Sequence, residues 1–331
     1  MNPIYGAGID VIEAIQSALA PQMDLFFKVV AFFGDIEFYI FAVAIIYWAW
    51  GKRRGVTLFL LLMGQGVVVS GVKVAAVQPR PYWFGEVEGI GTRTSYGLPS
   101  GHAAGSLTFF GWLALEVRRW WMWTIAAIAV ILIAFSRLYL GVHFPQDLLA
   151  GWAIALVALA VVPRLVDRYW DKWKGASPGF LVATGLLGAA ASIATWACAW
   201  AIASLQANDP AWARFAHGAR SPESFIVFAA AFFGASCGWI AARHWTSERL
   251  GGPWWRRLLG LAGGCVIVAV VVVVFEFAKP ADEGMVRHVV SFVQMGLASA
   301  TIIAGVPWLH RRFGLEAPFT DAKYPETTGC R

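Results

Sequence analysis

Long apolar blocks separated by short polar segments follow one another along most of the chain. The candidate blocks cover about residues 24–50, 55–77, 102–117, 120–136, 146–163, 178–206, 223–242, 258–278 and 287–309. A helix of about 20 apolar residues crosses the hydrocarbon core of a bilayer, and most blocks are close to that length. The pattern therefore predicts an all-α protein, a polytopic transmembrane helical bundle of about nine spans.

The two ends of the chain have a different pattern. Ile9, Ile12 and Ile15 recur at helical spacing within residues 1–23, which predicts a short amphipathic helix at the membrane surface, with a frayed tail as the alternative. The start lacks the basic residues of a cleavable signal peptide and carries Asp10 and Glu13 instead. Residues 313–331 are polar and are expected to form a disordered cytoplasmic tail.

Composition supports the membrane interpretation, and charge adds an orientation. Of the 331 residues, 59% are hydrophobic and only 14% are charged, whereas soluble domains carry about 25% charged residues. Alternate loops and the tail hold 17 of the 26 Lys and Arg residues, which predicts that this side is cytoplasmic, with the N-terminus outside and the C-terminus inside. The net charge of +6 is thereby explained by topology, and no nucleic-acid partner is expected.

Three polar stretches then fall together on the opposite, non-cytoplasmic side. They are "KVAAVQPRP" at the end of the second block, "PSGH" at the start of the third, and "SRLYLGVHFPQD" between the fourth and fifth. Charged groups beside lipid are costly and usually mark function. Asp35 and Glu37, in the outer part of the first block, are further candidates to line the same cavity.

The cationic and small residues of these stretches are suited to holding a phosphate group. Lys73, Arg80 and Arg137 supply positive charge and many hydrogen-bond donors. Ser100 stands where it can cap a helix whose free N–H groups favour an anion, and Gly101 lets the backbone approach a ligand closely. The alternative is that the long side chains only extend to the membrane interface.

Two histidines add chemistry to this phosphate cage. His143 precedes Asp147 by four residues, so the carboxylate can hold one ring nitrogen and leave the other as a nucleophile. His102 can then protonate the leaving oxygen. This set predicts hydrolysis of a phosphomonoester through a phosphohistidine, without a metal or cofactor; the alternative role for Asp147 is to cap its own helix.

The three stretches resemble the signature of the type 2 phosphatidic acid phosphatase superfamily: K-x-x-x-x-x-x-R-P, then P-S-G-H, then S-R-x-x-x-x-x-H-x-x-x-D. Every fixed position matches: Lys73, Arg80, Pro81, Pro99, Ser100, Gly101, His102, Ser136, Arg137, His143 and Asp147. The resemblance implies a phosphatase and haloperoxidase-like core with His143 as nucleophile, His102 as general acid and Asp147 as the residue that orients the nucleophile. It likewise implies that Lys73, Arg80, Ser100, Gly101 and Arg137 bind phosphate. On this basis residues 24–174 form the catalytic core, and residues 175–312 form additional spans.

The substrate class stays open at this point. The nine-span plan, "RPYWF", "PSGHAAG" and "FEFAKPAD" resemble the glucose-6-phosphatase branch, whereas Asp147 is a feature of the lipid phosphatases. We therefore expect either a lipid phosphate or pyrophosphate, such as phosphatidic acid, or a soluble sugar phosphate. A transporter or lipid-binding protein is the alternative outside the enzymes, and the intact His102, His143 and Asp147 argue against it. The expected location is a bacterial inner membrane, with the site facing the periplasm.

Overall fold

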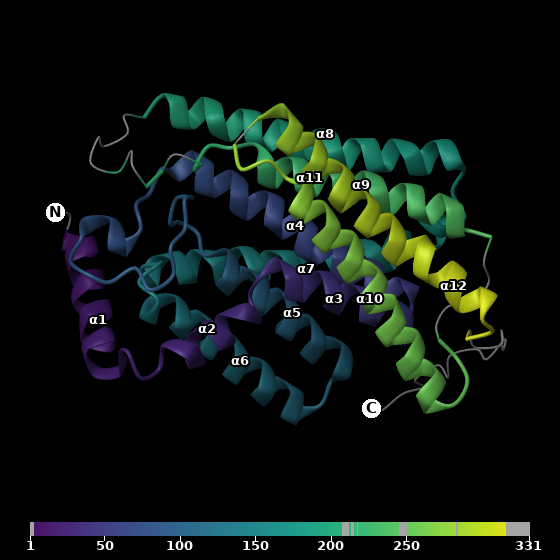
Figure 1. The fold of residues 1–331 in the computed structure, drawn as a ribbon, viewed down its shortest axis with the longest axis horizontal. Coiled ribbons are helices and arrows are strands. Elements are labelled where there is room, and N and C mark those ends of the chain that lie inside the picture. The colour runs from purple at the N-terminus through teal and green to yellow at the C-terminus, as the bar shows by residue number, and fades with distance from the viewer. Residues whose placement is uncertain are drawn as a thin grey trace.

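The computed structural model describes residues 3–206, 212, 215–216, 218–244, 250–282 and 284–315, and the fold is shown in Figure 1. Within these ranges the chain is helical and contains no β-strand. Helix α8 lies along one long edge of the bundle and the α5–α6 hairpin along the opposite edge (Figure 1). Residues 316–331, the greater part of the predicted tail, lie outside the described ranges.

The helices follow in chain order as α1 (Pro3–Leu19), α2 (Asp24–Phe32), α3 (Ile36–Ile45), the π-helical turn η1 (Ile46–Trp50), α4 (Lys52–Ala76), the 3₁₀ turn η2 (Pro81–Phe84), α5 (Gly101–Val117), α6 (Trp120–Tyr139), α7 (Pro145–Lys174), α8 (Pro178–Ser204), α9 (Glu223–Ala242), α10 (Trp254–Ala278), α11 (Met285–Ala300), the π-helical turn η4 (Thr301–Gly305) and α12 (Val306–Arg312).

The helical membrane fold is confirmed, but the count of nine spans is not. In the described part of the chain seven helical segments are long and apolar enough to cross a membrane, or eight if the bent pair α2 and α3–η1 is one span. That pair covers residues 24–50 and bends by 45°. The predicted span at 102–117 lies in α5, which has 17 residues, short of the roughly 20 that a perpendicular crossing needs.

Small residues allow the helices of the C-terminal half to pack closely. A Cβ atom added at Gly234 of α9 would lie 2.1 Å from the carbonyl oxygen of Gly296 in α11, and one at Gly238 would lie 3.0 Å from the Cα of Ala300. Since lipid supplies no hydrophobic driving force between helices, such close backbone contact supplies the attraction. Helices α9 and α11 therefore form a tight pair.

The N-terminal segment, predicted to be an amphipathic helix at the membrane surface, forms helix α1, and its apolar stripe is covered by protein. Ile9 and Ile12 are buried in a cluster with Val87 and Phe144. Gln16 fixes the other end of α1, because its amide donates to the carbonyl oxygens of Glu88 and Tyr139 at 2.9 and 2.8 Å. Helix α1 is thus packed against one end of the bundle (Figure 1).

The three polar stretches meet at one end of the bundle because helices α4 and α6 end there and α5 and α7 begin there. The basic segments lie at the other ends of the same helices, at residues 52–54, 118–119 and 164–174. Helix α4 has 25 residues and is therefore about 37 Å long at 1.5 Å per residue. The polar stretches and the basic segments are separated by that length.

Candidate active site

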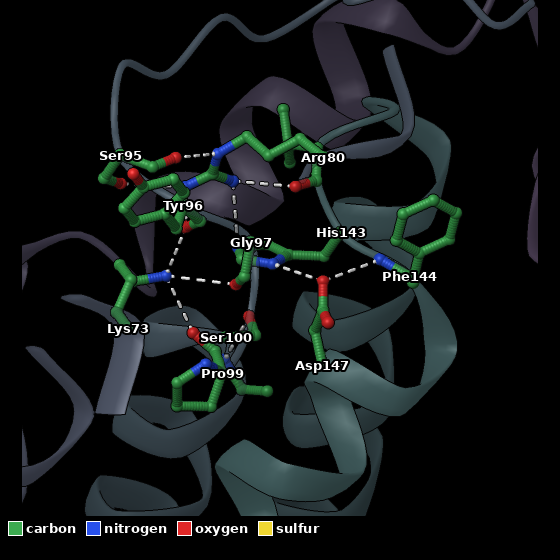
Figure 2. A network of polar contacts seen from close by, with 12 residues as sticks. Lys73, Arg80, Ser95, Tyr96, Gly97, Pro99, Ser100, His143, Phe144 and Asp147 are labelled. Carbon is green, nitrogen blue, oxygen red and sulfur yellow. Dashed lines mark hydrogen bonds and ion pairs between the residues drawn. The ribbon is translucent and has the colours of Figure 1, made fainter. Parts of the chain in front are cut away.

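Arg80 holds the loop that precedes α5. Its Nε donates to the carbonyl oxygen of Ser95 at 2.6 Å, and its Nη2 donates to Ser95 Oγ at 2.9 Å and to the carbonyl oxygen of Tyr96 at 3.1 Å. Its Nη1 donates to the carbonyl oxygen of Val142 at 2.7 Å and lies 3.4 Å from Nε2 of His143. Arg80, which is only 2% exposed, therefore ties the first stretch to the third and to the loop that leads into the second (Figure 2).

Lys73 approaches the same loop from the last turn of α4. Its Nζ donates to the carbonyl oxygens of Tyr96, Gly97 and Pro99 at 2.9, 3.1 and 2.8 Å (Figure 2). All three ammonium protons thus have partners in the loop. In this structure Lys73 contributes charge to the site and fixes the backbone that leads into α5.

The start of α5 has the arrangement expected of an anion site. Ser100 is its N-cap, and its hydroxyl accepts a hydrogen bond from the N–H of Ala103 at 3.4 Å. The N–H of Ser100 donates to the carbonyl oxygen of Asp147 at 2.8 Å, which joins the starts of α5 and α7. A Cβ atom added at Gly101 would meet only Val69, at 3.8 Å, so the protein itself leaves room there.

His143 and Asp147 form the predicted pair. Nδ1 of His143 lies 3.2 Å from Oδ2 of Asp147, and both side chains are buried. The same Oδ2 accepts the N–H of Phe144 at 2.9 Å, so Asp147 also caps the first turn of α7. Asp147 thus contacts His143 and caps its own helix through the same oxygen atom.

The position of His143 favours its neutral form. It lies in the loop between α6 and α7, and burial, followed by the positive charge of Arg80, lowers the pKa of its imidazole well below the usual value. With Nδ1 directed at the carboxylate, Nε2 is the nitrogen that faces Arg80 (Figure 2). An anion attracted by the positive charge of Arg80 would therefore lie close to Nε2 of His143.

Arg137 is a buried cation with an unused donor. It lies in the last turn of α6, is 2% exposed, and its Nε has no hydrogen-bond partner in the described part of the protein. An unsatisfied buried donor costs about 1–3 kcal/mol, and more when it is charged. Such a group is a natural place for an anionic ligand.

His102 occupies the second position of α5 and faces a carboxylate from another helix. Its Nε2 lies 3.0 Å from Oδ1 of Asp35, while the ring N–H is not directed at that oxygen well enough for a hydrogen bond. Asp35 also pairs with Arg93, whose Nη2 is 3.2 Å from Oδ1. Asp35 thus lies at the site, whereas Glu37 is an exposed residue of α3.

Sequence reasoning identified Pro99 but not the preceding loop, residues 95–98, as part of the site. Its carbonyl groups accept most of the hydrogen bonds from Lys73 and Arg80, and backbone groups leave little trace in a sequence. The one sign of this loop in the sequence is the glycine at position 97. The structure requires it there, because a Cβ atom would lie 2.5 Å from the carbonyl oxygen of Pro79. Across the described ranges, no three His, Cys, Asp or Glu side chains gather closely enough to hold a metal ion.

Comparison with known proteins gives two matches at the level of families. Residues 54–171 match the PAP2 superfamily, and residues 226–318 match the PAP2 superfamily phosphatase, transmembrane extension. The first match contains the whole site apart from Asp35. The second covers spans for which the sequence offered no motif.

Individual relatives are phosphatases and diphosphatases by name. The chain is 33% identical to undecaprenyl-diphosphatase of Sulfolobus acidocaldarius over 105 residues, which are 31% of this chain and 50% of that protein. It is 26% identical to lipid phosphate phosphatase delta of Arabidopsis thaliana over 170 residues, 46% of this chain and 41% of the relative. It is 30% identical to phosphatidylglycerophosphatase B of Bacillus subtilis over 84 residues, 23% of this chain and 41% of the relative.

The chain thus spans about half or less of the length of each of these relatives, and no solved structure matches it. The complete three-part signature, its assembly at one end of a helical membrane bundle, and the two family matches agree with one another. The chain carries a PAP2 superfamily domain at residues 54–171, together with the transmembrane extension of PAP2 phosphatases at residues 226–318.

Proposed function

We propose that this protein is an integral membrane phosphatase that cleaves a lipid phosphate monoester or pyrophosphate. The observation that carries the proposal is the buried contact of His143 with both Asp147 and Arg80. It combines a nucleophile, its orienting carboxylate and a phosphate-binding cation within one cluster. The relatives are named as phosphatases of lipid phosphates or of a polyprenyl diphosphate. These names support a lipid substrate.

The phosphoryl group is bound by cations and by the start of α5. Arg137 offers its unpaired Nε, and the free N–H groups that follow Ser100 offer the positive end of the helix dipole. Arg80 and Lys73 add charge while they hold the surrounding loop. Such preorganised donors stabilise the charge that spreads over the phosphoryl oxygens in the transition state.

The reaction proceeds in two steps through a phosphohistidine. Nε2 of His143 attacks phosphorus while Asp147 holds the Nδ1–H, and the bond to the leaving oxygen breaks as His102 donates a proton to that oxygen. Water then attacks the phosphohistidine, and His102, now neutral, takes a proton from this water. Phosphate leaves and His143 returns to its starting form. No step requires a metal ion or cofactor.

We propose that the active site faces the non-cytoplasmic side. The site lies at one end of α4 and α7, and the Lys- and Arg-rich segments lie at the other. Basic loops stay in the cytoplasm, so the site faces away from it, with the C-terminus inside. For a bacterial inner membrane this face is the periplasm.

The direct test is phosphate release by the purified protein in EDTA, with phosphatidic acid, a polyprenyl diphosphate and glucose 6-phosphate offered in parallel. We expect the lipid substrates to be cleaved and the sugar phosphate to be a poor substrate. His143→Ala should lower the rate to background, because loss of a covalent nucleophile can cost on the order of 10⁶-fold. His244→Ala, an exposed histidine beyond the end of α9, serves as the matched control. Full activity of His143→Ala would refute the mechanism, and preference for glucose 6-phosphate would refute the substrate class.

A further inference from the structure

Asp35 reaches the site through the bend between α2 and α3. The turn at Phe33–Asp35 separates the two helices, and it passes very close to α5. A Cβ atom added at Gly34 would lie 2.7 Å from Cδ2 of His102. The glycine therefore permits the approach that places the next residue, Asp35, beside the imidazole.

The carboxylate of Asp35 is not used by its own helix. Asp35 is the N-cap residue of α3, but its side chain makes no capping hydrogen bond. Its Oδ1 instead lies 3.0 Å from Nε2 of His102 and 3.2 Å from Nη2 of Arg93. An acid at an N-cap position normally accepts a backbone N–H, so its use here for two side chains points to a role outside α3.

The charges around His102 are mixed. Burial disfavours a positive imidazole, as do Arg137 at the end of α6 and Arg93 in the loop, and Asp35 is the neighbouring group that favours it. The side chain of His102 is only 13% exposed, so solvent screens these charges weakly. Without Asp35, the imidazole would face cations alone.

We propose that Asp35 is a positioning residue for the general acid His102. Its carboxylate lies 3.0 Å from Nε2 and stabilises the protonated ring by its charge, which leaves the Nδ1–H to protonate the leaving oxygen. Arg93 holds the carboxylate from its other side and keeps it at the bend. This inference rests on the proposed phosphatase function and adds a residue outside the three signature stretches.

Two substrates of different leaving group separate this role from a merely structural one. Departure of a lipid alkoxide needs a proton, whereas departure of p-nitrophenolate hardly does. Asp35→Asn should lower kcat for phosphatidic acid by about 100-fold, the lower end of general-acid contributions, with KM little changed. The loss for p-nitrophenyl phosphate should be much smaller. Equal losses for both substrates would overturn the proposal.

The pH profile gives a second readout. The basic limb of the kcat profile for phosphatidic acid should move to lower pH by about 1 unit in Asp35→Asn, because a stabilising opposite charge is lost. In Arg93→Gln the same limb should move to higher pH, because a cation is lost. Glu37→Gln, an exposed acid of the same helix, should leave the profile unchanged. A basic limb that stays fixed in Asp35→Asn and in Arg93→Gln would contradict the proposal.

Two further variants keep the outcomes distinct. Asp35→Glu retains the charge and should keep the basic limb of the kcat profile close to its wild-type position. If Asp35→Asn does not yield folded protein, Asp35→Glu and Arg93→Gln together test the proposal. His143→Ala tests the underlying reaction. If His143→Ala is inactive while Asp35→Asn has wild-type kcat and pH profile, the role of Asp35 fails and the phosphatase assignment stands. If His143→Ala is active, the proposed phosphatase mechanism is refuted, and the role of Asp35 that rests on it is refuted as well.

Discussion

Individual residues of the site combine roles that the sequence presents as alternatives. Oδ2 of Asp147 both caps α7 and contacts His143, so the rigidity of a helix start is transmitted to the imidazole. Lys73 has all of its donors committed to loop carbonyls, whereas Arg137 keeps a buried donor unused. Residues with the same charge in the same signature therefore differ in what they contribute to folding and to ligand binding.

This difference predicts opposite effects on stability. Lys73→Met leaves three loop carbonyls without their donor and should lower the free energy of unfolding by roughly 4 kcal/mol or more, since hydrogen bonds to charged groups contribute about 1.5–3 kcal/mol each. Arg137→Met removes an unsatisfied buried charge and should leave stability unchanged or raise it by about 0.5–2 kcal/mol. Thermal unfolding in detergent measures both. Phosphatase activity should be lost in each, and a destabilised Arg137→Met would contradict the assignment of a free donor.

Gly101 offers a test that separates ligand space from protein packing. Gly101→Ala meets only Val69 at 3.8 Å, so the variant should fold normally. Its methyl group would stand where phosphate is proposed to lie, and kcat/KM should fall by about 100-fold, the cost of roughly 1 Å of misplacement. Gly151→Ala is the contrasting variant, because its Cβ would lie 2.5 Å from the carbonyl oxygen of Ser100 and should destabilise the fold. Unchanged kinetics of Gly101→Ala would argue against phosphate binding at the start of α5.

The pKa of His143 predicts the acid side of the rate profile. In the proposed mechanism His143 must be neutral to attack phosphorus, and burial together with Arg80 lowers its pKa. Its neutral form therefore persists as the pH falls below 6.5, the ordinary value for histidine. The acid limb of kcat/KM, which reports groups of the free enzyme, should have its midpoint below pH 6.5. Titration of the substrate phosphate, followed by ³¹P NMR, is the control, and a midpoint above 6.5 assigned to the enzyme would contradict the structure.

At the scale of elements, the sequence predicted helix positions well and helix geometry poorly. Apolar blocks located the helices because lipid demands long apolar stretches. The 45° bend within residues 24–50 was not predicted, since hydropathy does not record direction. The signature predicted which side chains the structure brings together, such as those of His143 and Arg80. It did not point to residues 95–98, which take part through backbone carbonyls, and it left Asp35 open, because its partner His102 lies 67 positions along the chain.

At the scale of the whole molecule, the additional C-terminal spans (residues 175–312, here called the C-terminal extension) pack against α4, the helix that carries Lys73. Along α4, a Cβ atom at Gly66 would lie 2.7 Å from Phe228 of α9, and one at Gly71 would lie 2.6 Å from Cγ2 of Thr195 in α8. Gln206 also donates to the carbonyl oxygen of Ala75 at 2.7 Å. The extension is therefore a support for the site as well as an addition to the bundle.

The contact between α4 and α8 can be tested by a matched pair of substitutions. Gly71→Ala places its methyl against Cγ2 of Thr195 and should lower the free energy of unfolding by about 1–3 kcal/mol, the usual cost of overpacking. Activity should fall with it, because Lys73 follows two residues later. Thr195→Ser removes that methyl group and keeps the hydroxyl, so the double variant should recover both stability and activity. Additive effects of the two substitutions would show that the contact does not couple the extension to the site.

Orientation in the membrane is the property on which access of a lipid substrate depends. With the four cysteines replaced by serine, Glu86→Cys reports the end that carries the site and Arg119→Cys the basic end, and both positions are exposed. The excess of basic residues at the second end predicts that it is cytoplasmic. A membrane-impermeant maleimide should therefore label Glu86→Cys in intact cells and label Arg119→Cys only after the membrane is opened. Labelling in the reverse order would place the site in the cytoplasm, and the enzyme would then draw its substrate from the inner leaflet.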